Sequence, residues 1–287
     1  MRVFLLTALA AWPCAGQGRE EHDRPLVKRA FERLYNFNFA GAHLAADSHI
    51  AKYPEDPMGY AVRAASYLFH ELDRLKILES EFFIDDNKLA GKTPQRPDAS
   101  IRDRFYAAVT DAERAAHAAR ARDPSDSHAL FALSMSEGMK TDYTAFVEKR
   151  QLRSLPMARA SNSYAVQLLK NDPDFADAYL TTGLTEYLIG SLPFFIRWFV
   201  RFDGVRGDKK LAEANLQKVA RQGRYLGPFA EILLSILYLR EKQPRMSIML
   251  LENLVARYPE NPLFRKELAL LSAKYPGPGI RSANGNE

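Results

Sequence analysis

The histidines are the residues of this chain best suited by type to acid–base or metal chemistry. There are six of them: His22, His43, His49, His70, His117 and His128. His43 and His49 are six residues apart, which puts them on different faces of a helix. His70 is followed by Glu71, but the residues after that pair break the HExxH spacing of a helical zinc site. We therefore expect no metal site, and His49 is interpreted as a packed core residue.

Acidic and nucleophilic side chains give equally little support for catalysis. The pairs Glu79/Glu81 and Asp85/Asp86 are typical of solvated loop acids, with a weak cation site as the alternative reading. The chain has no Gly-x-Ser-x-Gly elbow, and its one cysteine, Cys14, falls in a segment expected to be removed. The sequence predicts neither an enzyme nor a cofactor.

One segment has an unusual composition and could meet a membrane or a partner. It runs from 192 to 202 and reads LPFFIRWFVRF. As a helix, it would place its two arginines on one face and apolar groups over the rest. It could lie at a membrane interface, or fold back over a neighbouring part of the chain with the arginine stems along apolar surface. The residues concerned are Phe194, Phe195, Arg197, Trp198, Phe199, Arg201 and Phe202.

The elements that position these side chains are marked by two nearly identical phrases, AKYPEDP at 51–57 and ARYPENP at 256–262. Each phrase ends one stretch of helical periodicity and begins another. Proline cannot continue a helix but is well placed in the first turn of the next one. Pro124 and Pro173 mark two similar boundaries. The chain is therefore predicted to use one helical unit several times.

This unit resembles the tetratricopeptide repeat (TPR), a 34-residue helix-turn-helix that ends in an Asp-Pro or Tyr-Pro step. The family places small residues where its two helices cross, because close helix packing needs small side chains at the contact. Counted from the prolines, every crossing position here is Ala, Ser or Gly. In first helices these are Ala30, Ala64, Ser134, Gly183 and Ser235. In second helices they are Ala42, Ala112, Ser161 and Ser247, and Ala212 fits a further helix at 209–222 capped by Asp208.

The predicted fold is an all-α, TPR-like solenoid of about five helix-turn-helix units over residues 19–275. A right-handed superhelix is what the resemblance implies, and a final helix at 261–272 is expected to cap the last unit. Three units carry insertions between their two helices, at about 73–97, 140–156 and 191–207. Since each occupies the same place in its unit, all three should emerge on one edge. They form either a docking surface or tolerated loops.

Residues 1–18 have the features of a secretory signal peptide, with Arg2 before an apolar run and a small-residue cleavage zone after it. A buried first helix is the alternative. Trp12 and Pro13 argue against lipidation at Cys14, so we expect a non-lipidated protein exported to the periplasm or envelope. The tail at 276–287 is expected to be disordered. A net charge of +5 without any basic run argues against a nucleic-acid partner.

The C-terminal half resembles a group of exported bacterial TPR proteins, through Gly183-Leu184, Leu192-Pro193, GVRGDK, GRYLGPFAEILLSILYLREK and RYPENPLF. It is distantly similar to TPR proteins of the mitochondrial outer membrane that are associated with inclusion-body clearance. The resemblance implies a scaffold that binds a protein or peptide and brings no catalytic residues.

A groove lined by the first helices would be the place for that partner. Its candidate residues are Tyr60, Tyr67, Tyr179, Glu186 and Tyr238, although aromatic residues at repeat spacing also serve as packing. Two other hypotheses remain open. One is a peripheral membrane protein that docks through residues 192–202. The other is a small-ligand carrier with a pocket under the insertions.

Overall fold

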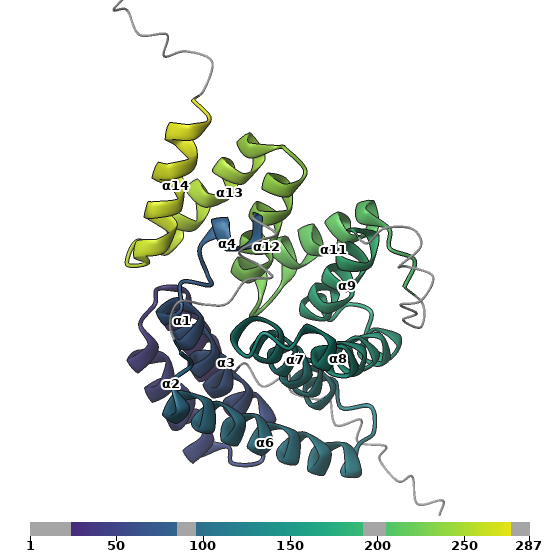
Figure 1. The fold of residues 1–287 in the computed structure, drawn as a ribbon. Helices are drawn as coiled ribbons and strands as arrows, with labels where there is room; N and C mark the ends of the chain where they lie inside the picture. The colour runs from purple at the N-terminus through teal and green to yellow at the C-terminus, as the bar shows by residue number, and fades with distance from the viewer. Residues whose placement is uncertain (1–23, 85–95, 192–204, 277–287) are drawn as a thin grey trace, which may run out of the picture.

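The computed structural model describes residues 24–84, 96–191 and 205–276. Within these ranges every regular element is a helix (Figure 1). Successive helices pack as pairs: α1 (Pro25–Tyr35) with α2 (Phe39–Lys52), α3 (Pro57–Arg74) with α6 (Ala99–Arg122), α7 (Ser127–Asp142) with α8 (Gln151–Asn171), α9 (Tyr179–Ser191) with α11 (Lys209–Gln222), and α12 (Gly227–Arg240) with α13 (Pro244–Arg257). A last helix, α14 (Pro262–Lys274), packs on α13. The predicted all-α, TPR-like solenoid of about five pairs and a capping helix is confirmed.

Small residues hold the two helices of each pair together, as predicted. All ten predicted crossing residues are buried. Ser134 and Ser161 each donate a hydroxyl hydrogen bond to the other's backbone carbonyl oxygen, at 3.0 and 2.8 Å. A Cβ placed on Gly183 would lie only 3.2 Å from the carbonyl oxygen of Ala212 on the partner helix. The crossing positions therefore set how closely each pair can approach.

The turns between pairs are fixed by helix caps and by one recurring tyrosine bond. Asp126 accepts hydrogen bonds from two backbone N–H groups of the first turn of α7, and Asp208 does the same for α11. The hydroxyl of Tyr60 donates to the carbonyl oxygen of Pro54, and that of Tyr179 to the carbonyl oxygen of Pro173, both at 3.1 Å. Each tyrosine thus ties its first helix to the turn that precedes it.

Helix α1 is also held by turns of the C-terminal units, the turn before α12 and the turn before α14, so that the array closes on itself (Figure 1). The Tyr35 hydroxyl donates to the carbonyl oxygen of Tyr225 at 2.8 Å, and its ring lies 5.5 Å from that of Tyr258. The amide of Asn261 donates to the carbonyl oxygen of Tyr35 at 2.8 Å. These contacts join residues 190 to 226 positions apart in the sequence.

Aromatic side chains occupy the interior that this closure creates. The Tyr225 ring lies 5.6 Å from that of Phe31 and 6.2 Å from that of Phe131. Phe69 of α3 packs edge-on against Phe229 of α12 at 5.5 Å. First helices from units far apart in the sequence therefore share one core, in contrast to an open solenoid where each unit contacts only its neighbours.

The second predicted insertion is mostly helical. The α7 helix extends to Asp142, a π-helical turn, η1 (Tyr143–Val147), follows, and α8 begins at Gln151 with Pro156 inside it. The inserted loop was expected to extend to Pro156, with the second helix of the unit beginning after it. Pro156 instead lies in the second turn of α8, where it removes a single intrahelical hydrogen bond.

Several predicted segments lie outside the described residues. They are the signal peptide at 1–18, nearly all of the 276–287 tail, and the aromatic stretch of the third insertion. Among the helices that the structure does describe, none combines the length and apolar character that a membrane crossing requires.

The two similar phrases carry different N-cap residues, Asp56 and Asn261, just before the final proline. Besides capping a helix, each side chain makes a second set of hydrogen bonds, and these differ. Asp56 caps α3 and accepts hydrogen bonds from Arg24 Nε and His49 Nε2, at 2.5 and 3.0 Å. Asn261 caps α14 through its oxygen and donates its amide to the Tyr35 carbonyl oxygen. An amide can accept on one side and donate on the other, whereas an ionised carboxylate can only accept.

Asn261→Asp should therefore destabilise the protein by about 2–3 kcal/mol, because a buried carboxylate would face the Tyr35 carbonyl oxygen without a donor between them. Asp126→Asn is the matched control. Its side chain only caps α7, where Asn and Asp are equivalent to within about 0.5 kcal/mol. The measurement is the free energy of unfolding from urea denaturation, and equal losses in the two variants would contradict the bridging role of Asn261.

Candidate functional site

The tyrosines predicted to line a partner groove are engaged within the chain. Tyr60 and Tyr179 bond the turns that precede their helices, and Lys218 lies over the Tyr179 ring at 3.8 Å. The Tyr67 ring packs at 4.2 Å on the His43 ring. Tyr238 is 3 % exposed, and its hydroxyl donates to Glu213 Oε1 at 2.7 Å. Each of the four tyrosines thus has a contact within the chain, and partner binding by them stays a prediction.

Glu186, the fifth predicted groove residue, is a buried backbone anchor. Its carboxylate accepts hydrogen bonds from the N–H groups of Arg206, Gly207 and Asp208, just before α11. Asp177, in the short 3-10 turn η2 (Ala176–Ala178), accepts in the same way from the N–H groups of 224–226, just after α11. Burial raises the pKa of Asp177 although these three bonds lower it. Two buried carboxylates thus hold both ends of α11.

The first two insertions meet at one place in the structure. The short helix α4 (Ser80–Ile84) belongs to the first insertion and packs on α12. The rings of Phe82 and Phe83 lie 6.1 and 5.6 Å from the ring of Phe146 in η1, both edge-to-face. Lys149, also in the second insertion, lies over the Phe82 ring at 4.5 Å. The sequence pattern placed these two insertions on one edge but did not single out their aromatic residues.

Polar contacts fix the same segment to the C-terminal units. Arg240, the last residue of α12, donates to the carbonyl oxygen of Phe83 at 2.5 Å. Lys266 of α14 forms a salt bridge with Glu79 at 2.7 Å, and the hydroxyl of Ser80 donates to the neighbouring Glu267. We define the insertion surface as Phe146, Lys149, Arg240, Lys266 and Glu267. The segment seated on it is 77–83.

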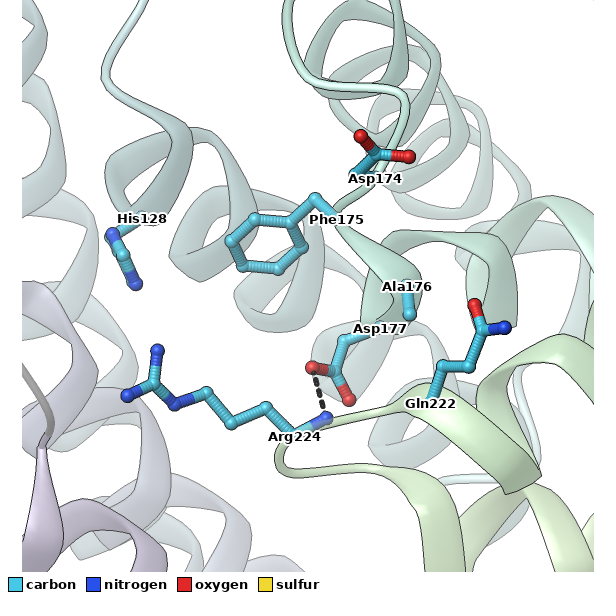
Figure 2. Close-up of a pocket in the computed structure, with 7 residues that line it drawn as sticks. All are labelled: His128, Asp174, Phe175, Ala176, Asp177, Gln222 and Arg224. Atoms are coloured by element: carbon cyan, nitrogen blue, oxygen red, sulfur yellow. Dashed lines mark hydrogen bonds between the residues drawn. The ribbon is translucent and has the colours of Figure 1, made fainter. Parts of the chain in front are cut away.

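A hollow of about 370 Å³ lies at the opposite ends of the helices, where units join (Figure 2). It is lined by His128, Asp174, Phe175, Ala176, Asp177, Gln222 and Arg224. Figure 2 shows the Arg224 side chain extending across it toward His128, while the Arg224 N–H bonds the Asp177 carboxylate. Its size falls at the lower end of the range for ligand pockets, but its lining is largely polar and carries both signs of charge. A small-ligand role stays a prediction, and this hollow is not under the insertions where it was expected.

The histidines do not assemble a metal or catalytic centre in the described part of the chain, where no cluster of three or more His, Cys, Asp or Glu could hold an ion. His49 is 1 % exposed and bonds Asp56, as expected of a core histidine. Burial and, secondarily, the charge of Arg24 lower the pKa of His128 to about 4. The membrane-docking candidates of the third insertion, residues 194–202, lie outside the described residues and remain a prediction.

The chain was compared with protein families, with curated proteins and with solved structures. A search against protein-family models and a search of curated proteins found no match. Among solved structures, the chain is similar to TTC0263, a thermophilic TPR protein of Thermus thermophilus. The two are 16% identical with a TM-score of 0.46, over 87% of this chain and 99% of that one. From its own helix pairing, the chain is an all-α, TPR-like solenoid.

Two half-buried side chains, Asp142 and His128, should give opposite pH dependences of stability. Burial raises the pKa of Asp142 to about 7, so between pH 4 and 7 the folded state keeps a proton that the unfolded chain releases. That contribution is present at low pH and is lost as pH rises toward 7. The lowered pKa of His128 acts in the other direction, because between pH 4 and 6.5 only the unfolded chain takes up the proton.

Asp142→Asn should therefore gain stability relative to wild type as the pH rises from 4.5 to 7, and His128→Asn should lose it. Each difference changes by at most about 1.4 kcal/mol per pH unit, and by less for side chains with residual solvent access. Urea denaturation of the three proteins at several pH values measures both slopes. Slopes of the same sign would show that these environments differ from those described.

Proposed function

We propose that this protein is a scaffold that binds a protein partner through a short peptide segment. One observation carries the proposal: the insertion surface already holds a stretch of chain, 77–83, that is outside the repeated helix pairs. An aromatic cluster, an arginine bond to a backbone carbonyl oxygen and a salt bridge fix it there. Peptide-binding surfaces commonly combine backbone hydrogen bonds with pockets for a few side chains.

The energetic character of the surface supports the same proposal. Aromatic and arginine side chains that become buried on association carry most of the binding energy of protein interfaces. Phe146 and Arg240 supply one of each, and they come from different units, so the helix pairs must be assembled before the surface exists. A repeat scaffold can therefore present them at a fixed separation.

A peptide-display selection on the folded full-length chain tests this function. Selected peptides should bind in solution, and Phe146→Ser should weaken them at least about tenfold, because truncation of a central aromatic anchor commonly costs about 2 kcal/mol or more. Leu152→Ser is the control, since Leu152 is 83 % exposed on α8 and belongs to no cluster described above. Failure to enrich any sequence above the denatured chain would contradict a peptide-binding scaffold.

We also propose that the protein is exported to the bacterial envelope and works in an assembly there. Residues 1–18, with Arg2 followed by a short apolar run, support this proposal. If the protein is exported, the partner that it binds belongs to the envelope.

Expression of the full chain in a Gram-negative bacterium should yield a periplasmic protein whose mass lacks the leader. Leu5→Arg/Leu6→Arg should abolish processing, because two charges interrupt the apolar run that the export machinery recognises. Intact-mass measurement of osmotic-shock and cytoplasmic fractions gives the result. An unprocessed wild-type chain confined to the cytoplasm would contradict export.

A further inference from the structure

We propose that segment 77–83 is an intramolecular competitor for the insertion surface, and that the partner is a peptide with the same acidic and aromatic chemistry. This inference rests on the proposed function of that surface. The resting protein is then self-occupied, and the partner gains access by displacing a piece of the chain itself.

The segment has the contacts of a ligand bound to distant units. Its polar contacts reach residues 157 to 187 positions away in the sequence, on α12 and α14. Its α-helical part, α4, is only five residues long and takes no part in the helix pairing that builds the solenoid. Phe82 is nonetheless 8 % exposed, as a bound anchor residue would be.

Segment and surface are also complementary in charge. The segment reads ILESEFF and carries two glutamates, whereas the surface supplies three cationic side chains, Lys149, Arg240 and Lys266. Lys266 forms a salt bridge with Glu79, and Lys149 lies over the Phe82 ring. Arg240 donates a hydrogen bond to the carbonyl oxygen of Phe83. Glu267 accepts from the hydroxyl of Ser80. The surface thus favours an acidic residue and a hydroxyl, followed within a few residues by two aromatic residues.

The loss of affinity that the tethered segment causes follows from its effective concentration at the insertion surface. A tethered segment acts at an effective concentration on the order of millimolar. A free peptide that binds the vacant surface with a dissociation constant of about 10 μM would therefore bind the self-occupied protein roughly a hundredfold more weakly. Self-occupancy of this size restricts binding to partners that present the peptide at high local concentration or with more contacts.

A fluorescently labelled synthetic peptide of residues 77–84 provides the test. It should bind the full-length Phe82→Ser/Phe83→Ser variant at least about tenfold more tightly than wild type, because the tethered competitor has lost its aromatic anchors. Adding Arg240→Ala to that variant should weaken binding again, and a scrambled peptide should bind neither form. Fluorescence anisotropy gives the three dissociation constants of peptide 77–84 and shows whether the scrambled peptide binds.

Equal binding to wild type and variant would overturn the competition. If the variant does not fold, hydrogen exchange on wild type decides: saturating peptide should increase exchange at the amides of 77–83, and unchanged exchange overturns the proposal. A dimeric mass for wild type in solution, with a monomeric mass for the variant, would mean that segment 77–83 binds the insertion surface of a second copy. That result also overturns the proposal. If display-selected peptides still bind while peptide 77–84 binds neither form, the competition is wrong and the scaffold function stands.

Discussion

Close approach of two helices at one small residue from each is the constraint on which this structure depends. At Ser134 and Ser161 the contact is fixed by mutual hydroxyl-to-carbonyl hydrogen bonds, and at Gly183 an added Cβ would lie only 3.2 Å from the carbonyl oxygen of Ala212. Larger side chains would increase the distance between the helix axes, which is set by the residues at the contact. The aromatic rings of the interior come from several pairs at once, so their packing relies on each pair keeping its separation.

Closure then decides where the protein can present a binding surface. In an open solenoid the inner faces of the first helices are available to a partner. Here Phe31 and Phe131 both pack on Tyr225 on that side, and Tyr35 is bonded by Tyr225 and Asn261. Chemistry that could distinguish one partner from another is found instead where the first two insertions meet, at Phe146 and the cationic residues around it. The repeats provide the framework, and the inserted segments provide the recognition chemistry.

The local structure could be predicted from the sequence because its causes are local. Prolines and caps mark helix ends, so the helix at 209–222 and its cap Asp208 were located to the residue. The crossing residues followed from counting.

Closure of the array could not be predicted, because the contact of Asn261 with Tyr35 depends on the summed rotation between all successive helix pairs. Glu186 was predicted to face a partner. The sequence before the helix at 209–222 nonetheless carried a signal for its structural role, since the N–H groups at the start of a helix need acceptors. Two adjacent phenylalanines with no place in the repeat pattern were the available signal for the insertion surface.

The amide of Asn261 also bears on how this protein could have changed in length during evolution. Arrays of helical repeats usually gain and lose units easily, because each new unit needs only a neighbour to stack on. In this chain, one extra pair would rotate the C-terminal turn away from the first helix and leave the Tyr35 carbonyl oxygen and the Asn261 amide without each other. Together with the contacts of Tyr35 to Tyr225 and Tyr258, this bond couples the terminal units to each other and opposes their independent fraying. The contacts of Tyr35 with Tyr225, Tyr258 and Asn261 therefore favour a fixed number of units, and variation in length is better accommodated within the insertions.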